Sequence, residues 1–248
     1  MANDIPPGLT AELAPTGRLR AAINYGNPVL AKRDPASGAP GGVSVALARA
    51  LAERLGLPLD LVAYEAAGQV TDAARSGVWD IAFLAIDPVR AAEIDFTAPY
   101  VLIEGTYLVR KDSPLRQVEE VDRSGHRILV TRGSAYALYL KRALRQAALV
   151  EEPASAPYLD LFRAGNFDAA AGVRQPLVAF ARLHPELHVM DGRFMAIEQA
   201  MVVQKGRPAA LRYVRAFLEE HKASGFVERA LRASGEADAT VAPAAKLD

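Results

Sequence analysis

The residue with the clearest chemical role in this sequence is Arg90, which follows a short apolar run. The run predicts a buried strand, and Asp87 and Pro88 predict a helix start, as N-cap and first helical residue. Arg90 then lies in the first turn, beside backbone N–H groups that have no helical partner. A guanidinium at that place can bind a carboxylate or a phosphate. The alternative is a surface arginine paired with Glu93 or Asp95.

Composition excludes several classes of protein. The 248 residues suit one large or two small domains, and 51% of them are hydrophobic, which is enough for a proper core. Basic and acidic residues balance at 29 each, so the basic surplus of a nucleic-acid or membrane-surface binder is missing. The chain has no cysteine, which excludes disulfides, thiolate zinc sites and cysteine nucleophiles.

The N-terminal residues 1–8 have neither the basic start nor the apolar centre of an export signal. No segment approaches the ~20 apolar residues of a membrane span. We therefore expect a soluble chain, periplasmic if a leader has been removed and cytoplasmic otherwise.

Apolar runs alternate with amphipathic stretches throughout, which indicates an α/β fold of mixed sheets flanked by helices. The Ala-rich residues 235–248 are expected to be disordered. Strands are predicted at 19–24, 59–64, 80–86, 126–131, 149–151, 167–172 and 199–204, with an extended run at 105–114, and helices at 43–55, 67–76, around Arg90, at 135–147, 158–164, 175–183 and 208–222.

The alternation of strands and helices falls into two successive blocks, which predicts two lobes. We expect residues 1–109 and 206–248 to form lobe 1 and residues 110–205 to form lobe 2. Two antiparallel crossings would then form a hinge above a cleft. Ligands of open α/β sheets bind beyond the carboxyl ends of the strands, so loops of both lobes would line that cleft.

The order and spacing of several short segments resemble the bilobal solute-binding proteins of ABC importers, in the class that binds polar amino acids. The resemblance spans roughly residues 17 to 230 and implies a type II periplasmic-binding fold. It also implies a monomer without cofactor or catalysis, a small carboxylate or amino acid as ligand, and an ABC permease as partner. The segments are GRLR (17–20), GVSVALA (42–48), SGVWD (76–80), DPVR (87–90), DFTAPY (95–100), GSAY (133–136) and AGNFDAA (164–170).

The resemblance implies two contacts to the carboxylate of a ligand. Arg90 matches the family's arginine that binds the α-carboxylate. Ser134, followed by Ala135, matches the position whose hydroxyl and neighbouring N–H groups hold the same carboxylate from the second lobe. A helix start after Gly133 also favours an anion on physical grounds alone. The alternative for Ser134 is an ordinary N-cap, and both roles are compatible.

Further ligand contacts are implied in lobe 1. Asn24, Tyr25 and Asn27 match the loop that packs on the ligand's side chain. Tyr25 would stack on the solute or pack against its own lobe. Ala85 stands where a hydroxyl or backbone contact to the ligand is common.

The chain departs from the family at Val173, where amino-acid binders carry an aspartate that holds the α-ammonium. A valine cannot pair with a cation. One reading is a ligand without an α-ammonium, with Arg174 as a second anion contact or as a solvent-facing arginine. The other is that Glu104 or Glu198 supplies the missing charge.

An enzyme on the same fold is the alternative function. Residues 182–187 (RLHPEL) and the acid Glu198 resemble cyclohexadienyl dehydratases, in which an enclosed Glu198 would act as general acid. Otherwise Glu198 is a hinge carboxylate paired with a cation such as Lys205. The valine at position 173 also departs from the dehydratases.

Other kinds of site find little support in the sequence. His184 and His188 flank Pro185 and are expected at the surface rather than around a metal. Ser134 has no evident partners for a catalytic triad, and no glycine-rich phosphate loop follows a strand. No helix-turn-helix segment precedes residue 17, which argues against a transcription regulator.

Overall fold

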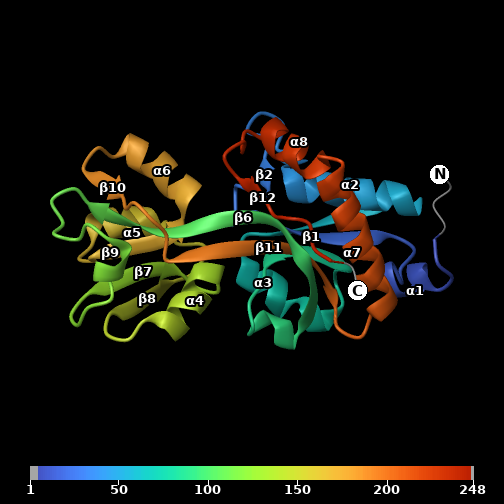
Figure 1. The fold of residues 1–248 in the computed structure, drawn as a ribbon, viewed down its shortest axis with the longest axis horizontal. Helices are drawn as coiled ribbons and strands as arrows, with labels where there is room; N and C mark the ends of the chain where they lie inside the picture. The colour runs from blue at the N-terminus through green and yellow to red at the C-terminus, as the bar shows by residue number, and fades with distance from the viewer. Residues whose placement is uncertain (1–4, 247–248) are drawn as a thin grey trace. The chain divides into compact units, whose positions relative to one another are not determined.

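The computed structural model describes residues 5–246, which divide into two compact units. Unit 1 comprises the residues up to Leu102 together with those from Glu198 onward, and unit 2 comprises Ile103–Ile197. Two long strands, β6 (Ile94–Arg110) and β11 (Met195–Gln204), pass from one unit into the other (Figure 1). The division therefore falls within these strands, whereas the predicted lobe boundaries, after residues 109 and 205, lie at their C-terminal ends.

The sheet of unit 1 has the strand order β4-β1-β5-β11-β6. The strand β1 is parallel to β4 and β5, and β11 runs antiparallel to β5 with Gln199 opposite Ala85. The strands that lie wholly in this unit are β1 (Leu19–Asn24), β4 (Leu59–Tyr64), β5 (Ile81–Ala85), the hairpin of β2 (Lys32–Arg33) and β3 (Pro40–Gly41), and β12 (Thr240–Val241), which pairs with β6.

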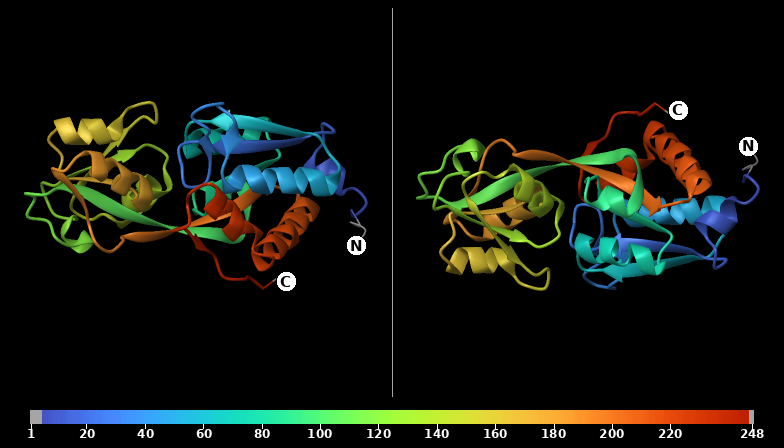
Figure 2. Two further views of the ribbon diagram at one scale, coloured as in Figure 1. Left: turned by 90° about the horizontal axis from the view of Figure 1, so that it is seen from above. Right: turned by 90° about the horizontal axis from the view of Figure 1, so that it is seen from below.

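Helices cover the sheet of unit 1, as Figure 2 shows from two sides. On one face Trp79 is buried with Val70, Ala82 and Leu84, and its ring N–H donates to the Val70 carbonyl at 3.1 Å. Trp79 is thus part of the core of unit 1. The helices are α1 (Leu9–Leu13), α2 (Val43–Leu55), α3 (Ala67–Asp72) with a 3-10 turn at Ala74–Ser76, α7 (Pro208–Ala223) and α8 (Phe226–Ala233).

Unit 2 has the strand order β6-β9-β7-β8, in which β7 is parallel to both β8 and β9 and β6 is antiparallel to β9. The short strand β10 also pairs with β6. The elements are β7 (Arg127–Thr131), β8 (Ala148–Glu152), β9 (Ala169–Val173), β10 (Leu187–Val189), α4 (Ala135–Ala143), α5 (Tyr158–Ala164), α6 (Arg174–Leu183) and a 3-10 turn at Val118–Glu120.

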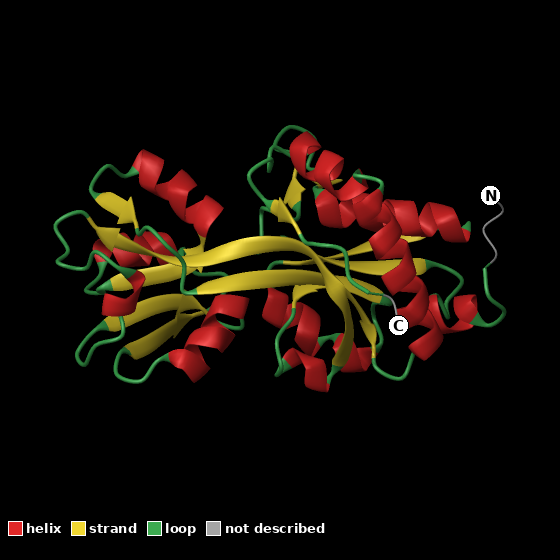
Figure 3. Cartoon of the chain, in the orientation of Figure 1, coloured by secondary structure: helices red, strands yellow, loops and turns green. Residues whose placement is uncertain are grey.

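Alternation along β9 places helices on both faces of this sheet. Ala169 and Ala171 pack in one buried cluster with Leu140 of α4, whereas Ala170 packs in another with Phe162 of α5. Successive strand residues point to opposite faces, so α4 and α5 must lie on opposite sides, as the cartoon in Figure 3 shows. The predicted α/β architecture of mixed sheets flanked by helices is confirmed.

Several boundaries differ from the prediction. The helix expected at 135–147 ends at Ala143, and the run expected from 105 is the second half of a strand that begins at Ile94. The segment after residue 235 was expected to be disordered, and that prediction is wrong for its described part. Ala239 and Ala242 are buried there, and β12 pairs with β6. Small alanines carry little periodic signal, so the sequence did not reveal this packing.

Within residues 5–246, no helix combines the length and the hydrophobicity needed to cross a bilayer. The expectation about an N-terminal leader rests partly on residues 1–4, which lie outside the described part of the chain.

Candidate ligand-binding residues

A tight turn, and not a helix, carries Arg90 away from the end of β5. The Val89 amide donates to the Asp87 carboxylate and the Ala91 amide donates to the Asp87 carbonyl, both at 2.9 Å. Only Arg90–Ala92 forms a 3-10 turn before β6 begins, so the predicted helix is wrong. One turn carries no appreciable macrodipole, and the Asp87 contacts set the position of Arg90 instead.

The Arg90 side chain is buried, with 2% of the residue exposed. Its guanidinium donates to the Ala85 carbonyl at 3.0 Å, at the carboxyl end of β5. Burial lowers the pKa of Arg90 to about 10, against the opposing charge of Asp87, so the group is still cationic at pH 7. The surface alternative is wrong, because Glu93 pairs with Arg75 and Asp95 faces Lys205.

The end of β1 and the loop after it place two asparagines and a tyrosine in the same unit. The Asn24 side chain accepts a hydrogen bond from the Gly26 amide at 3.0 Å. Asn27 is 8% exposed, and its side-chain oxygen has no hydrogen-bond partner within residues 5–246. The guanidinium of Arg33 lies 3.9 Å from the centre of the Tyr25 ring, which covers one face of that ring.

Ser134 caps the start of α4 in unit 2. Its hydroxyl accepts from the Ala137 amide at 3.1 Å, and its carbonyl accepts from the Leu138 amide at 3.0 Å. The N-cap reading is therefore confirmed. The amides of Ala135 and Tyr136 belong to the first helical turn, where N–H groups have no intrahelical acceptor, so they are directed out of the helix end, where an anion is favoured.

Glu104 and Arg174 form an ion pair in unit 2, with 2.6 Å between Oε2 and Nε. Arg174 also donates to the carbonyls of Met190 and Gly192, and Arg193 lies 3.2 Å from the other Glu104 oxygen. The sequence-based alternatives made Glu104 and Arg174 separate ligand contacts, and neither alternative included this pairing. The register of β6 and β9 explains this pairing. Gly105 lies opposite Val173 in the antiparallel pair, so Glu104, which precedes Gly105, is a neighbour of Arg174, which follows Val173.

The acid proposed for dehydratase chemistry is exposed. The backbone carbonyl of Glu198 accepts from the Ile86 amide at 2.8 Å, while its side chain faces solvent. Lys205, its expected partner, lies instead 3.5 Å from Asp95, so that pairing is wrong. A general acid with a raised pKa needs an enclosed, apolar setting, and no observation here favours it.

The histidines take part in side-chain packing and surface contacts. His184 accepts at Nδ1 from the Arg163 guanidinium, at 3.0 Å, and its ring centre lies 4.3 Å from that of Phe180. His188 is exposed. In the described part of the chain, no group of three or more histidine, aspartate or glutamate side chains is arranged to hold a metal ion.

Each unit thus carries its own set of polar groups beyond strand ends, built on the fold described above. The sequence profile of the bacterial extracellular solute-binding proteins, family 3, matches residues 19–233. The chain belongs to this family. The resemblance predicted from the short motifs is thereby confirmed, and so is the solute-binding role.

Individual relatives of this solute-binding protein are distant. A glutamine-binding protein of Geobacillus stearothermophilus is 24% identical over 185 residues, which cover 72% of this chain and 69% of the relative. An amino acid ABC transporter substrate-binding protein of Streptococcus pneumoniae, solved with L-arginine, is 21% identical with a TM-score of 0.77, over 91% of this chain and 97% of that one. An ancestral amino acid-binding protein, a precursor of cyclohexadienyl dehydratase, is 24% identical with a TM-score of 0.74, over 90% and 97%. The two solved structures share the type II fold.

Proposed function

We propose that this protein captures a small solute bearing a carboxylate, an amino acid or a related organic acid, and delivers it to an ABC importer. The relatives support this ligand class, since one is named for glutamine and two for amino acids, one of which was solved with L-arginine. They are binding proteins, and the chain is accordingly assigned no catalysis.

The observation that carries the proposal is the buried guanidinium of Arg90 at the carboxyl end of β5. A cation that is 2% exposed is stabilised by a ligand carboxylate, because a charge-assisted pair is strong where water is excluded. Asn27, in the loop after β1, would offer its buried side-chain oxygen to a donor on the same ligand.

In unit 2, the proposed partner of the same carboxylate is the start of α4. The amides of Ala135 and Tyr136, with the hydroxyl of Ser134, would hold an anion without any cationic side chain. A ligand that both units contact favours the state in which both contacts form. We therefore propose capture by closure of the two units about the strands β6 and β11.

The proposal must also name the acid that would pair with an ammonium group of the ligand. Glu104 already pairs with Arg174 and Arg193, so the charge of Glu104 is neutralised without a ligand ion. Glu198 is exposed and makes no side-chain ion pair among residues 5–246, which leaves it as the acid proposed for an ammonium. For a ligand without an ammonium, Arg174 is the predicted second anion contact, and that role would require Arg174 to separate from Glu104.

A binding screen tests the function. Thermal-shift measurements against amino acids, keto acids and dicarboxylates should show stabilisation by one class, followed by calorimetry on the strongest ligand. Arg90→Ala should then weaken binding more than tenfold, since a hydrogen-bonded charge contact contributes about 1.5–3 kcal/mol. Arg75→Ala is the control, because Arg75 is an exposed arginine of the same unit that pairs with Glu93. Unchanged affinity in Arg90→Ala would remove this residue from the site.

We also propose that the protein acts outside the cytoplasm, in the periplasm or at the cell surface, as a monomer that meets its permease there. The extracellular character of the family supports the compartment. Fractionation of the native cells, with detection of the protein by antibody, tests it. Recovery with cytoplasmic markers would contradict this proposal while leaving the ligand class untouched.

A further inference from the structure

The chain beyond α8 runs back along β6 in unit 1, visible in Figure 2 as the red segment that leads to the C-terminus. In the antiparallel pair of β12 and β6, Thr240 lies opposite Leu102 and Val241 opposite Val101. The Ala242 amide then donates to the Tyr100 carbonyl at 3.0 Å. These contacts cover the outer edge of β6, whose inner edge in this unit faces β11.

A buried lysine fixes this segment to α7. The Lys222 side chain is 3% exposed, and its ammonium donates to the Pro243 carbonyl at 2.7 Å, to the Pro99 carbonyl at 3.0 Å and to Glu219 at 2.7 Å. The other oxygen of Glu219 accepts from the Ala245 amide at 2.9 Å. Three acceptors satisfy the three donors of the ammonium, so the segment is held by a neutralised buried pair rather than by loose surface contacts.

The partner on the outer edge of β6 changes at the division between the units. The strand β12 pairs with β6 as far as Leu102, and β9 takes up pairing at Gly105, opposite Val173. Within residues 5–246, neither strand pairs with Ile103 or Glu104, and the two units separate between Leu102 and Ile103. On this outer edge, a stretch of two residues between two paired stretches restrains the extended backbone less than its neighbours do.

The segment also lies beyond the family profile, which ends at residue 233. The residues of this segment that contact β6 therefore lie outside the region matched by the family profile.

We propose that residues 239–245 are a strap that holds β6 to unit 1 as far as Leu102 and so confines the bending of β6 to Ile103 and Glu104. The inference rests on the proposed function in one respect, that the two units move relative to each other when a solute is captured. The strap then sets the position of the pivot, and its release lengthens the flexible stretch toward Tyr100.

Hydrogen–deuterium exchange of the ligand-free protein tests the strap directly. Ala242→Pro removes the amide that donates to Tyr100, whereas Ala244→Pro, two residues further on, alters an exposed residue whose amide makes no hydrogen bond in the described chain. We expect exchange over residues 99–104 to become at least tenfold faster in Ala242→Pro, with β1 and β4 unchanged and Ala244→Pro like the wild type. Equal exchange in all three proteins, or acceleration throughout unit 1, would overturn the proposal.

A second variant guards against misfolding of the first. Lys222→Met removes the three contacts of the ammonium and should accelerate exchange over the same residues, while Lys205→Met, at an exposed lysine of the same unit, should not. Acceleration in neither variant would show that the strap does not restrain β6.

The spread of distances between the two units gives a separate measure of how freely β6 bends. Because the chain has no cysteine, Glu53→Cys and Ser124→Cys allow one spin label in each unit without background labelling. Pulsed electron paramagnetic resonance measures the distribution of distances between the two labels. We expect this distribution to widen about twofold when Ala242→Pro is added, and to stay the same with Ala244→Pro. Equal widths would refute the pivot. Neither experiment uses a ligand, so a failed solute screen would count against the proposed function alone.

Discussion

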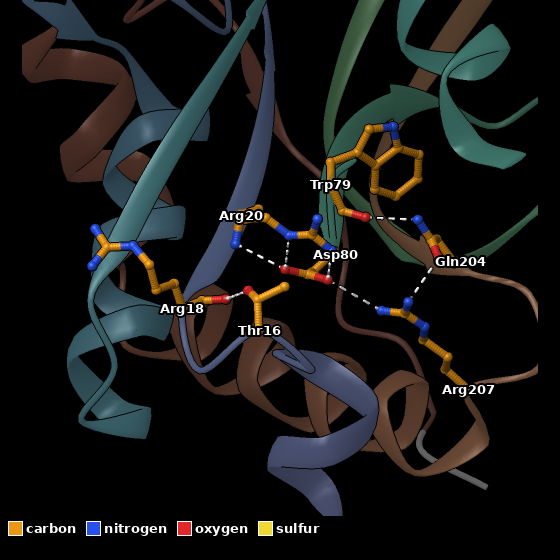
Figure 4. A network of polar contacts seen from close by, with 7 residues as sticks. All are labelled: Thr16, Arg18, Arg20, Trp79, Asp80, Gln204 and Arg207. Atoms are coloured by element: carbon orange, nitrogen blue, oxygen red, sulfur yellow. Dashed lines mark hydrogen bonds and ion pairs between the residues drawn. The ribbon is translucent and has the colours of Figure 1, made fainter. Parts of the chain in front are cut away.

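Arg20 and Asp80 are joined by three hydrogen bonds to a carboxylate that has no exposed surface (Figure 4). The backbone amide and Nε of Arg20 donate to one oxygen at 3.0 Å, and a terminal nitrogen donates to the other at 2.8 Å. Arg207 lies 3.4 Å from the second oxygen. The pair fixes the start of β5 against β1, and β5 is the strand whose far end presents Arg90.

Asp80→Asn should therefore destabilise the protein by about 3 kcal/mol, the range found when one partner of a buried ion pair is removed. The neutral amide leaves the Arg20 guanidinium, whose side chain is only 20% exposed, without its counter-charge. Urea denaturation followed by circular dichroism measures the loss.

Asp60→Asn is the matched control for that substitution. Asp60 binds Arg18 through two similar hydrogen bonds, of 2.7 and 2.6 Å, but both side chains are more than 40% exposed. Solvent screens such a pair, so its removal should change stability little. If both variants lose the same stability, burial is not what makes the Asp80 pair important.

Ser134 gives a prediction that separates folding from binding. Ser134→Ala removes the N-cap bond to Ala137 and should cost about 1 kcal/mol, whereas Ser134→Thr keeps a hydroxyl at the cap and should cost less. If α4 holds the ligand carboxylate, Ser134→Ala also weakens binding and Ser134→Thr largely restores it. Calorimetry beside urea denaturation checks both. An alanine variant that loses stability but binds normally would exclude the end of α4 from the site.

Much of this fold could be predicted from the sequence because its elements have local signals. The helix 43–55 ends where predicted because Gly56 adopts φ 63°, a conformation that favours glycine. Strand β5 is a continuous apolar run that is buried on both faces, so its position was evident without any partner.

What the sequence did not reveal depends on contacts between distant residues. Glu104 and Arg174 are 70 positions apart, and only the register of β6 with β9 makes them neighbours. The turn at Arg90 is short because β6 begins at Ile94, a tertiary pairing that overrides the N-cap pattern of Asp87 and Pro88. The strap follows the same rule, since its alanines are ordered by β6 and Lys222.

Gly42 should not tolerate a side chain. Its φ is 100°, and an added Cβ would lie 2.4 Å from the Leu30 carbonyl oxygen and 2.9 Å from the Ala31 Cα. Both are backbone atoms, so relieving the clash would require a backbone shift. Gly42→Ala should therefore destabilise the protein by more than about 2 kcal/mol in urea denaturation. Gly41→Ala is the control, because its nearest neighbour would be 3.7 Å away. Comparable stability of the two variants would mean that the loop carrying Asn27 moves freely.

His221 should make stability depend on pH near and below the ordinary imidazole pKa of 6.5. Its ring lies 4.0 Å from the Phe217 ring centre and 4.8 Å from that of Phe226, and burial lowers the pKa of His221 below its ordinary value of 6.5. The unfolded chain then binds more protons than the folded one in the interval below 6.5. Stability should fall as the pH drops through 6.5 and level off below the folded pKa.

The carboxylates of Asp122 and Glu220 do not obscure this interval. The pKa of Asp122 is lowered by the backbone amides it accepts from, against its burial, and that of Glu220 by Arg54, so their stabilisation is lost only at more acidic pH. Urea midpoints at pH 7.5 and 5.5 should differ in the wild type and differ less in His221→Phe, which keeps an aromatic ring but cannot titrate. An equal pH dependence in both proteins would show that another group is responsible.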